Sequence, residues 1–176
     1  MLTRRQLGLS TAALALAACS KAQTQAIAAD GTAEGKVMSD HTSAVANVDW
    51  ANLSEQEWKT RLTAEQFQVL RKEGTERPFT SELLENKAEG VYACAGCKLP
   101  LFKSDTKYKS GTGWPSFFQA IEGNVGTKVD RKLFVPRTEY HCARCGGHQG
   151  HVFKDGPRPT GLRYCNNGIA LTFIAA

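Results

Sequence analysis

Cys94-Ala95-Gly96-Cys97 has the C-x-x-C spacing, and Cys142-Ala143-Arg144-Cys145 repeats it. This spacing lets the two thiolates of one motif face a single metal ion, and two motifs complete a tetrahedral site of four sulfurs. Such a site has no open position for a substrate, so its role would be structural. The pattern predicts one structural Zn2+ held by Cys94, Cys97, Cys142 and Cys145.

Two other interpretations of these motifs exist. Two disulfides would suit an exported protein, because oxidising compartments preserve them. A thioredoxin-like redox pair would need a strand followed by a helix, and neither motif has that context. The paired spacing favours zinc over both.

Outward from these motifs, the sequence from Gly90 onward is typical of short strands. Apolar runs are brief and are broken by Gly, Pro, Asn and Asp, and strands do not alternate with helices. Residues 125–129 are expected to form a hairpin with residues 133–135. The predicted fold is mainly β and antiparallel, with strands at 91–94, 99–103, 125–130, 132–136, 139–142, 151–154 and 169–174.

A short helical arm is expected before the strands. Ser54 and Thr63 each begin a capping box, in which a side-chain oxygen accepts a hydrogen bond from the third backbone N–H of the helix. The first helix should run to about Arg61, and Gly74 should cap the C-terminus of the second. Residues 81–85 are expected to add one more helical turn.

The N-terminal segment has the features of an export signal. Arg4 and Arg5 form a twin-arginine pair before an apolar run that is too short to span a bilayer. The run ends in a stretch that resembles a lipobox, whose cysteine would be Cys19; cleavage after Ala28 is the alternative. We therefore expect a signal at 1–19, a flexible tether at 20–47 and a folded domain at 48–176. The protein would lie on the periplasmic side, and its only membrane contact would be a lipid on Cys19.

Composition and charge exclude some classes of partner. The 176 residues are 41% hydrophobic and 22% charged, with a formal net charge of +5, as in an ordinary globular protein. The Lys and Arg residues are scattered, so no nucleic-acid-binding surface is predicted. We expect a monomer.

Cys165 is left over when the other cysteines of the domain are paired, and it lies within Arg163-Tyr164-Cys165-Asn166-Asn167. If this stretch is extended, the side chains of Arg163, Cys165 and Asn167 share a face. A guanidinium favours the thiolate, and the amide of Asn167 can donate a hydrogen bond to an oxygen. Cys165 is therefore a candidate nucleophile; a buried, inert cysteine is the alternative.

Two further motifs could serve such a nucleophile. His148 and His151 lie in a Gly-rich stretch that ends at Phe153, and both histidines can act as acids near neutral pH. They could also be a metal pair, but the cysteines already complete the metal site. Trp114 follows Gly111-Thr112-Gly113 and precedes a proline, so it could be an exposed aromatic wall for a small apolar group; a core position is the alternative.

Taken together, the blocks G-T-G-W-P-S-F, G-H-x-G-H-V-F and R-x-C-x-N and the two C-x-x-C pairs resemble the B-type methionine sulfoxide reductases, which are specific for the R epimer. The resemblance covers residues 50–173. It implies two antiparallel sheets in a tent-like barrel and a zinc site of four cysteines. It also implies that Cys165 attacks the sulfoxide sulfur and becomes a sulfenic acid. The surrounding residues would be His148, His151 and Asn167 at the sulfoxide oxygen, Trp114 and Phe153 at the substrate, and Arg163 beside the nucleophile.

One residue departs from the family pattern. Many members carry a resolving cysteine at the position of Thr112. Its replacement predicts that an external, thioredoxin-like thiol outside the inner membrane reduces the sulfenic acid directly, although an unlipidated Cys19 could also resolve it. From a different class of protein, a zinc-ribbon binding module without catalysis is the alternative function.

Overall fold

The structure, a computed structural model, describes residues 48–176. This part of the chain opens with two helices, α1 (Glu55–Arg61) and α2 (Ala64–Lys72). Both begin with the expected capping boxes, in which Ser54 and Thr63 accept hydrogen bonds from the third backbone N–H. The helical arm is therefore confirmed. The predicted signal, Cys19 and tether, all within residues 1–47, lie outside the described residues.

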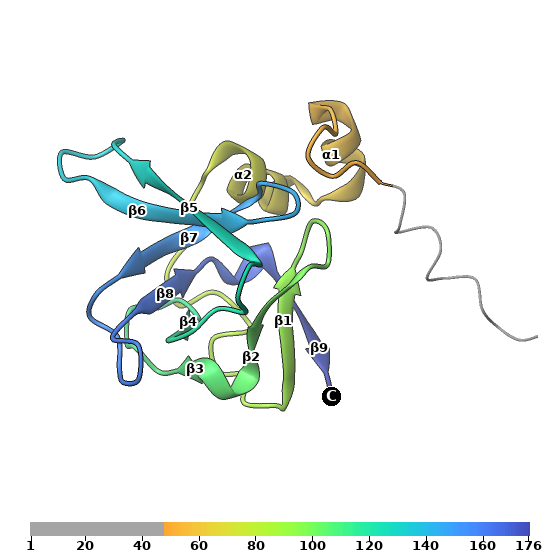
Figure 1. Ribbon diagram of the computed structural model, residues 1–176. Helices are drawn as coiled ribbons and strands as arrows, with labels where there is room; N and C mark the ends of the chain where they lie inside the picture. The colour runs from red at the N-terminus through yellow and green to blue at the C-terminus, as the bar shows by residue number, and fades with distance from the viewer. Residues whose placement is uncertain (1–47) are drawn as a thin grey trace, which may run out of the picture. The chain divides into compact units, whose positions relative to one another are not determined.

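Within the described residues, the strands form two antiparallel sheets, as predicted (Figure 1). The smaller sheet has the order β2-β1-β9, and the larger has the order β3-β4-β8-β7-β6-β5. Their strands are β1 (Gly90–Cys94), β2 (Pro100–Lys103), β3 (Lys107–Tyr108), β4 (Ser116–Phe117), β5 (Val125–Asp130), β6 (Arg137–Cys142), β7 (His148–Phe153), β8 (Arg163–Asn166) and β9 (Leu171–Ala175), with 3-10 turns η1 (Ser104–Thr106) and η2 (Gly168–Ala170).

Aromatic side chains from both sheets form the centre of the core. Phe102 of β2 stacks on Phe117 of β4 with ring centroids 4.2 Å apart, and Tyr92 of β1 meets Phe117 edge-on at 5.0 Å. Tyr140 of β6 meets Tyr164 of β8 edge-on at 5.2 Å. Offset and edge-on pairs of this kind add to the stabilisation from burial alone. The contacts of Phe117 with Phe102 and Tyr92 hold the larger sheet against the smaller one.

The helices cover the two C-x-x-C motifs. The buried indole of Trp58 lies against Gly96, where a Cβ would come within 3.2 Å of the ring. Arg71 of α2 stacks over Trp58 at 4.8 Å and donates a hydrogen bond of 2.8 Å to the carbonyl of Cys145. The arm therefore shields this cysteine cluster from solvent.

One predicted strand is wrong. Residues 132–136 form no strand, and β5 pairs instead with β6 in a register that sets Asp130 opposite Arg137. The intervening loop closes because the Asp130 carboxylate accepts hydrogen bonds from the backbone N–H of Lys132 and the side chain of Arg137. The apolar run that suggested a strand is exposed to solvent. Apolar character alone therefore gave a false strand.

Other boundaries differ by smaller amounts. Glu73, not Gly74, caps α2 in the left-handed conformation. Residues 81–85 form a hydrogen-bonded turn instead of the expected turn of helix; the N–H of Leu84 donates to the carbonyl of Ser81. β7 begins at His148 rather than at residue 151. The short strands β3 and β4 were not predicted, because two-residue strands carry no periodic signal.

No helix within residues 48–176 is long and apolar enough to cross a membrane.

Candidate active site

The four cysteines of the C-x-x-C motifs converge in one buried cluster. Their sulfurs all lie within 4.8 Å of one another, and two close contacts join the two motifs: Cys94 to Cys145 at 3.7 Å and Cys97 to Cys142 at 3.4 Å. A disulfide would need about 2.05 Å, and all four thiols are free. Four sulfurs around Zn2+ at about 2.3 Å would lie about 3.8 Å apart, close to these distances. The cluster therefore fits a tetrahedral metal ion better than disulfides or a redox pair.

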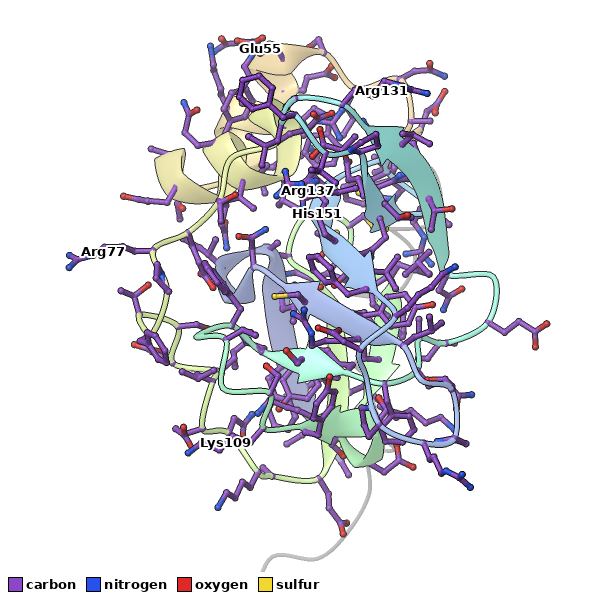
Figure 2. All side chains as sticks on the ribbon, turned by 90° about the vertical axis from the view of Figure 1, so that its left-hand side faces the viewer. Glu55, Arg77, Lys109, Arg131, Arg137 and His151 are labelled. Carbon is purple, nitrogen blue, oxygen red and sulfur yellow. The ribbon has the colours of Figure 1, made fainter. Side chains whose placement is uncertain are left out.

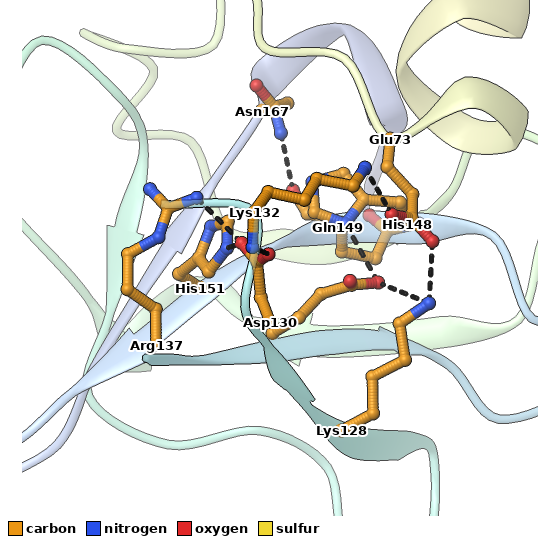
Figure 3. Close-up of polar contacts among 10 residues, drawn as sticks. Glu73, Lys128, Asp130, Lys132, Arg137, His148, Gln149, His151 and Asn167 are labelled. Atoms are coloured by element: carbon orange, nitrogen blue, oxygen red, sulfur yellow. Dashed lines mark hydrogen bonds and ion pairs between the residues drawn. The ribbon is translucent and has the colours of Figure 1, made fainter. Parts of the chain in front are cut away.

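A buried amide connects this cluster to the strand of Cys165. Gln149 is fully buried, and its Nε2 donates to the Cys94 sulfur at 3.4 Å. Its side-chain oxygen accepts from Asn166, and its backbone oxygen accepts from the side chain of Asn167 at 3.0 Å (Figure 3). Displacement of the cysteine cluster would therefore be transmitted to the end of β8.

Strand register brings the reacting residues together. On β8, Cys165 lies directly opposite His151 of β7 and Ser116 of β4. Opposite residues in an antiparallel pair point to the same face of the sheet. A Cβ at Gly150 would overlap the carbonyl oxygen of Cys165. Glycine at this position therefore lets β7 approach β8 closely enough to set His151 beside the thiol.

The half-buried thiol of Cys165 opens into a cavity of about 110 Å³. A larger groove of about 740 Å³ lies between α2, residues 74–83 and β9, and Cys165 is not part of its wall. We take the smaller cavity as the candidate active site because it contains the thiol. Its walls are formed by Thr75, Trp114, Arg137, Gly150, His151, Phe153, Cys165, Asn166 and Asn167.

Burial raises the pKa of the Cys165 thiol above its ordinary value. A 3.8 Å contact with the hydroxyl of Thr112 and the positive charge of Arg163 act in the opposite direction and favour the thiolate. Arg163 is itself held by two hydrogen bonds of 2.8 Å to the Asp155 carboxylate, and it stacks over Phe153 at 4.2 Å. Arg163 lowers the pKa of Cys165, as predicted, but burial raises this pKa by more.

His151 is oriented by a carboxylate that sequence reasoning did not identify. Its Nε2 lies 2.7 Å from Asp130, whose other strong partner is Arg137 at 2.6 Å (Figure 3). Because an ionised carboxylate only accepts hydrogen bonds, Nε2 carries the hydrogen and Nδ1 of the neutral ring is an acceptor. Burial lowers the pKa of His151, so the neutral ring is favoured at pH 7.

His148 occupies a different environment from His151. It is 3% exposed and is not part of the cavity wall, and its ring packs against that of His151 with centroids 5.6 Å apart. Its Nδ1 lies 3.0 Å from Glu139, at an ion-pair distance but without hydrogen-bond alignment. Only one of the two predicted histidines therefore reaches the cavity.

Glu76 contacts both Asn167, which also donates to Gln149, and Trp114. The backbone N–H of Glu76 donates to the side-chain oxygen of Asn167 at 3.0 Å, and its carbonyl accepts from the indole N–H of Trp114 at 3.1 Å. Its carboxylate accepts from the backbone N–H groups of Gly168 and Ile169 at 2.6 and 2.9 Å. Both cavity residues thus depend on a loop more than thirty residues before Trp114.

Comparison with known proteins assigns this arrangement to a family. Residues 62–175 match the SelR domain. The chain belongs to the SelR-domain family. It is an oxidoreductase that reduces methionine sulfoxide. This activity excludes the alternative of a non-catalytic zinc-ribbon binding module.

Three similar relatives support this assignment. "Peptide methionine sulfoxide reductase B1, chloroplastic" of Arabidopsis thaliana is 51% identical over 82% of this chain and 72% of its own length. "Peptide methionine sulfoxide reductase MsrB" of Methanosarcina barkeri is 57% identical over 68% of this chain and 85% of its own. The protein of the same name in Leptospira interrogans is 54% identical over 69% and 94%.

In this SelR-domain protein, the structure adds residues to the site that sequence reasoning missed. Arg137 lines the cavity, Asp130 orients His151, and Glu76 holds Asn167 and Trp114. None of the three carries a local signal, because each acts on residues that are distant in sequence. Asp130 ended a predicted strand, but its partnership with His151 depends on the pairing of β5, β6 and β7.

Proposed function

We propose that this enzyme reduces the R epimer of methionine sulfoxide in peptides, with Cys165 as the nucleophile. The observation that carries the proposal is one small cavity. It combines the thiol of Cys165 with an indole, a carboxylate-bound histidine and an anchored amide, from Trp114, His151 and Asn167. These are a nucleophile, an apolar wall and two groups able to interact with an oxygen.

In the proposed reaction, the Cys165 thiolate attacks the sulfoxide sulfur. Trp114 and Phe153 contact the thioether carbons, and the second N–H of the Asn167 amide donates to the sulfoxide oxygen. The Nδ1 of neutral His151 accepts the thiol proton of Cys165 and passes it to that oxygen, and His148 supports the His151 ring by packing against it. Arg163 stabilises the thiolate. The substrate sulfur gains two electrons and leaves as methionine, while Cys165 loses two electrons and takes the oxygen as a sulfenic acid.

Regeneration needs an external thiol in this proposal. Thr112, 3.8 Å from the sulfur, offers a hydroxyl where a resolving cysteine would offer a thiol. The sulfenic acid therefore reacts with one thiol of a thioredoxin-like reductant to form a mixed disulfide and water. A second thiol of the reductant then releases Cys165 and leaves a disulfide in the reductant.

We propose that the metal in the cysteine cluster is Zn2+. Cys94, Cys97, Cys142 and Cys145 would hold it, and their all-sulfur set suits zinc. When bound, the ion would cross-link the two motifs and take no part in the reaction. The residues around it act on the site indirectly, through the hydrogen bond from Gln149 to Cys94.

We also propose that the protein is exported and acts as a monomer on the periplasmic side. The support for export is the sequence of residues 1–19, with its arginine pair and the lipobox-like stretch before Cys19. Residues 20–47 would then be a tether and residues 48–176 the reductase domain. Mass spectrometry of membrane and soluble fractions would find a lipidated N-terminal Cys19; an unprocessed Met1 in the cytosol would contradict the proposal.

Cys165→Ser tests the catalytic assignment. The variant should lose all reduction of methionine-R-sulfoxide, assayed with separated epimers and a dithiol, and should keep the metal content and melting temperature of the wild type. Residual R-epimer reduction would refute the nucleophile, and equal turnover of the S epimer by the wild type would refute the specificity. After a single turnover without reductant, mass spectrometry should detect a sulfenic acid on Cys165. An internal disulfide to Cys165 would refute direct reduction.

A further inference from the structure

The loop between β5 and β6 carries an exposed apolar surface. Leu133, Phe134 and Val135 are 57%, 108% and 71% exposed, and we call these three residues the apolar tip. Figure 1 shows the β5–β6 hairpin projecting beyond the rest of the larger sheet. Consecutive large apolar side chains left in water are unfavourable, and such patches often mark interaction sites.

The apolar tip is joined directly to the wall of the catalytic cavity. Arg137, which lines the cavity, follows Val135 by two residues, so their Cα atoms lie within about 8 Å. Asp130 fixes the base of the loop through the N–H of Lys132 at 2.9 Å, and the same carboxylate binds His151. In Figure 2, Arg131, Arg137 and His151 lie on the side that faces the viewer, the side toward which the hairpin projects in Figure 1.

Most of the charges around the apolar tip are already paired. Lys132 lies 2.5 Å from Glu73, and Lys128 lies 2.6 Å from the same carboxylate. Arg137 is bound to Asp130. Among the described loop residues, Arg131 is the cation left without an ion pair. This pattern favours an apolar occupant over an anionic one, such as an acidic membrane or a nucleic acid.

The size of the cavity shows what else a bound polypeptide must contact. Its volume of about 110 Å³ is well below the roughly 300–1,000 Å³ of sites that enclose whole small molecules. Only the oxidised side chain can enter it, and the flanking residues must lie on its rim. Methionine belongs to the residues most often buried in protein cores, so in an unfolded chain it becomes accessible together with other apolar side chains.

We propose that the apolar tip binds apolar side chains that flank methionine sulfoxide in an unfolded polypeptide. This inference rests on the proposed function and specifies its substrate class. The cavity recognises the sulfoxide, and the tip adds contact area that a folded protein with buried neighbours, or the free amino acid, does not provide. The tip therefore acts on substrate affinity and not on the chemical step.

The test compares three substrates: a short peptide with methionine-R-sulfoxide flanked by Leu and Val, the same peptide flanked by Ser and Gly, and N-acetyl methionine-R-sulfoxide. The variant is Leu133→Ser/Phe134→Ser/Val135→Ser, and Phe134→Ser alone is a milder form. In the triple variant, KM for the apolar peptide should rise about tenfold or more with kcat unchanged, as expected when an aromatic anchor is truncated. The other two substrates should change by less than about twofold.

Val129→Ser is the matched control. Val129 is 60% exposed and lies on the same hairpin, but its side chain points to the face opposite that of the adjacent Asp130. This variant should leave every KM unchanged. All variants should melt like the wild type, because the replaced side chains are exposed; if the triple variant does not fold, Phe134→Ser takes its place in the comparison.

An unchanged KM for the apolar peptide, or an equal rise with Val129→Ser, would overturn the proposal. A second outcome would also overturn it: the triple variant no longer binds phosphatidylglycerol vesicles while its KM for the apolar peptide is unchanged. That result would assign the tip to membrane binding instead. Failure of the wild type to reduce even N-acetyl methionine-R-sulfoxide would refute the proposed function itself, and this outcome is distinct from the others.

Discussion

The cysteine cluster and the Cys165 site use the same side chain in opposite ways. In the cluster, each sulfur is surrounded by other sulfurs, under the cover of Trp58 and α2. Cys165 has no cysteine neighbour among the described residues; around it lie a hydroxyl, an imidazole and an indole. Sulfurs that converge can satisfy one cation, whereas a single sulfur at an open cavity can meet a substrate. Neighbours and access, not the residue type, divide the two roles.

Replacing a cluster cysteine should have the largest effect on the protein. Cys142→Ser removes one ligand of the proposed zinc site and should unfold the domain, because structural zinc would contribute roughly 10–16 kcal/mol against a total stability of roughly 5–15 kcal/mol. The measurements are metal content and a thermal melt, with and without a strong chelator. Cys165→Ser makes the same chemical change at the other site and is the control. If the chelator leaves the melting temperature of the wild type unchanged, the cluster is not a stabilising metal site.

Replacing His151 should affect catalysis and spare the fold. His151→Gln removes the proton relay at the cavity, and kcat should fall about 100-fold, the lower end of general acid–base contributions. His141→Gln is the matched control, because His141 lies on β6 over Gly126 and is not part of the cavity wall. Steady-state kinetics with the R epimer would measure both variants. Equal losses in the two variants would remove His151 from the mechanism.

Thr112 provides a smaller test of how Cys165 differs from the cluster. Because burial raises the pKa of Cys165, its thiolate fraction, and so its alkylation rate, should still be increasing with pH in the alkaline range. Thr112→Val removes a hydroxyl that favours the thiolate, so the pKa of Cys165 should rise further. At pH values below that pKa, alkylation should slow roughly threefold, as expected for the loss of one modest hydrogen bond. Peptide-level mass spectrometry of iodoacetamide labelling gives the rate at each pH. Thr127→Val, on exposed β5, is the control; an unshifted profile for Thr112→Val would show that this contact does not tune the thiol.

The predictions from sequence succeeded where the signal was local. The capping boxes at Ser54 and Thr63 and the antiparallel, mainly β fold are all observed. The error at residues 132–136 came from reading apolar residues as buried, when they form an exposed loop beside the active site. An apolar run shows that burial is possible, but only the surrounding chain decides whether it occurs.

The sequence predicted only part of the candidate site, because contacts between distant strands leave no local signal. The short motifs pointed to Cys165, His151, Trp114 and Asn167, and the structure brings these four into one cavity. The motif with two histidines could not show that only one of them would reach the cavity. Nor could it show that a carboxylate from another strand would hold that ring, because this partner is separated from it by twenty-one residues.

The sequence by itself determined the chemistry available to this protein: four cysteines at metal-binding spacing, one further thiol within the domain, and a threonine at position 112. These properties depend on residue identity and spacing along the chain. The tertiary structure decided which groups act together. It set His151 opposite Cys165, placed Asp130 behind that histidine and left the apolar tip in solvent. These relations arise from the register between strands, which only the packed fold specifies.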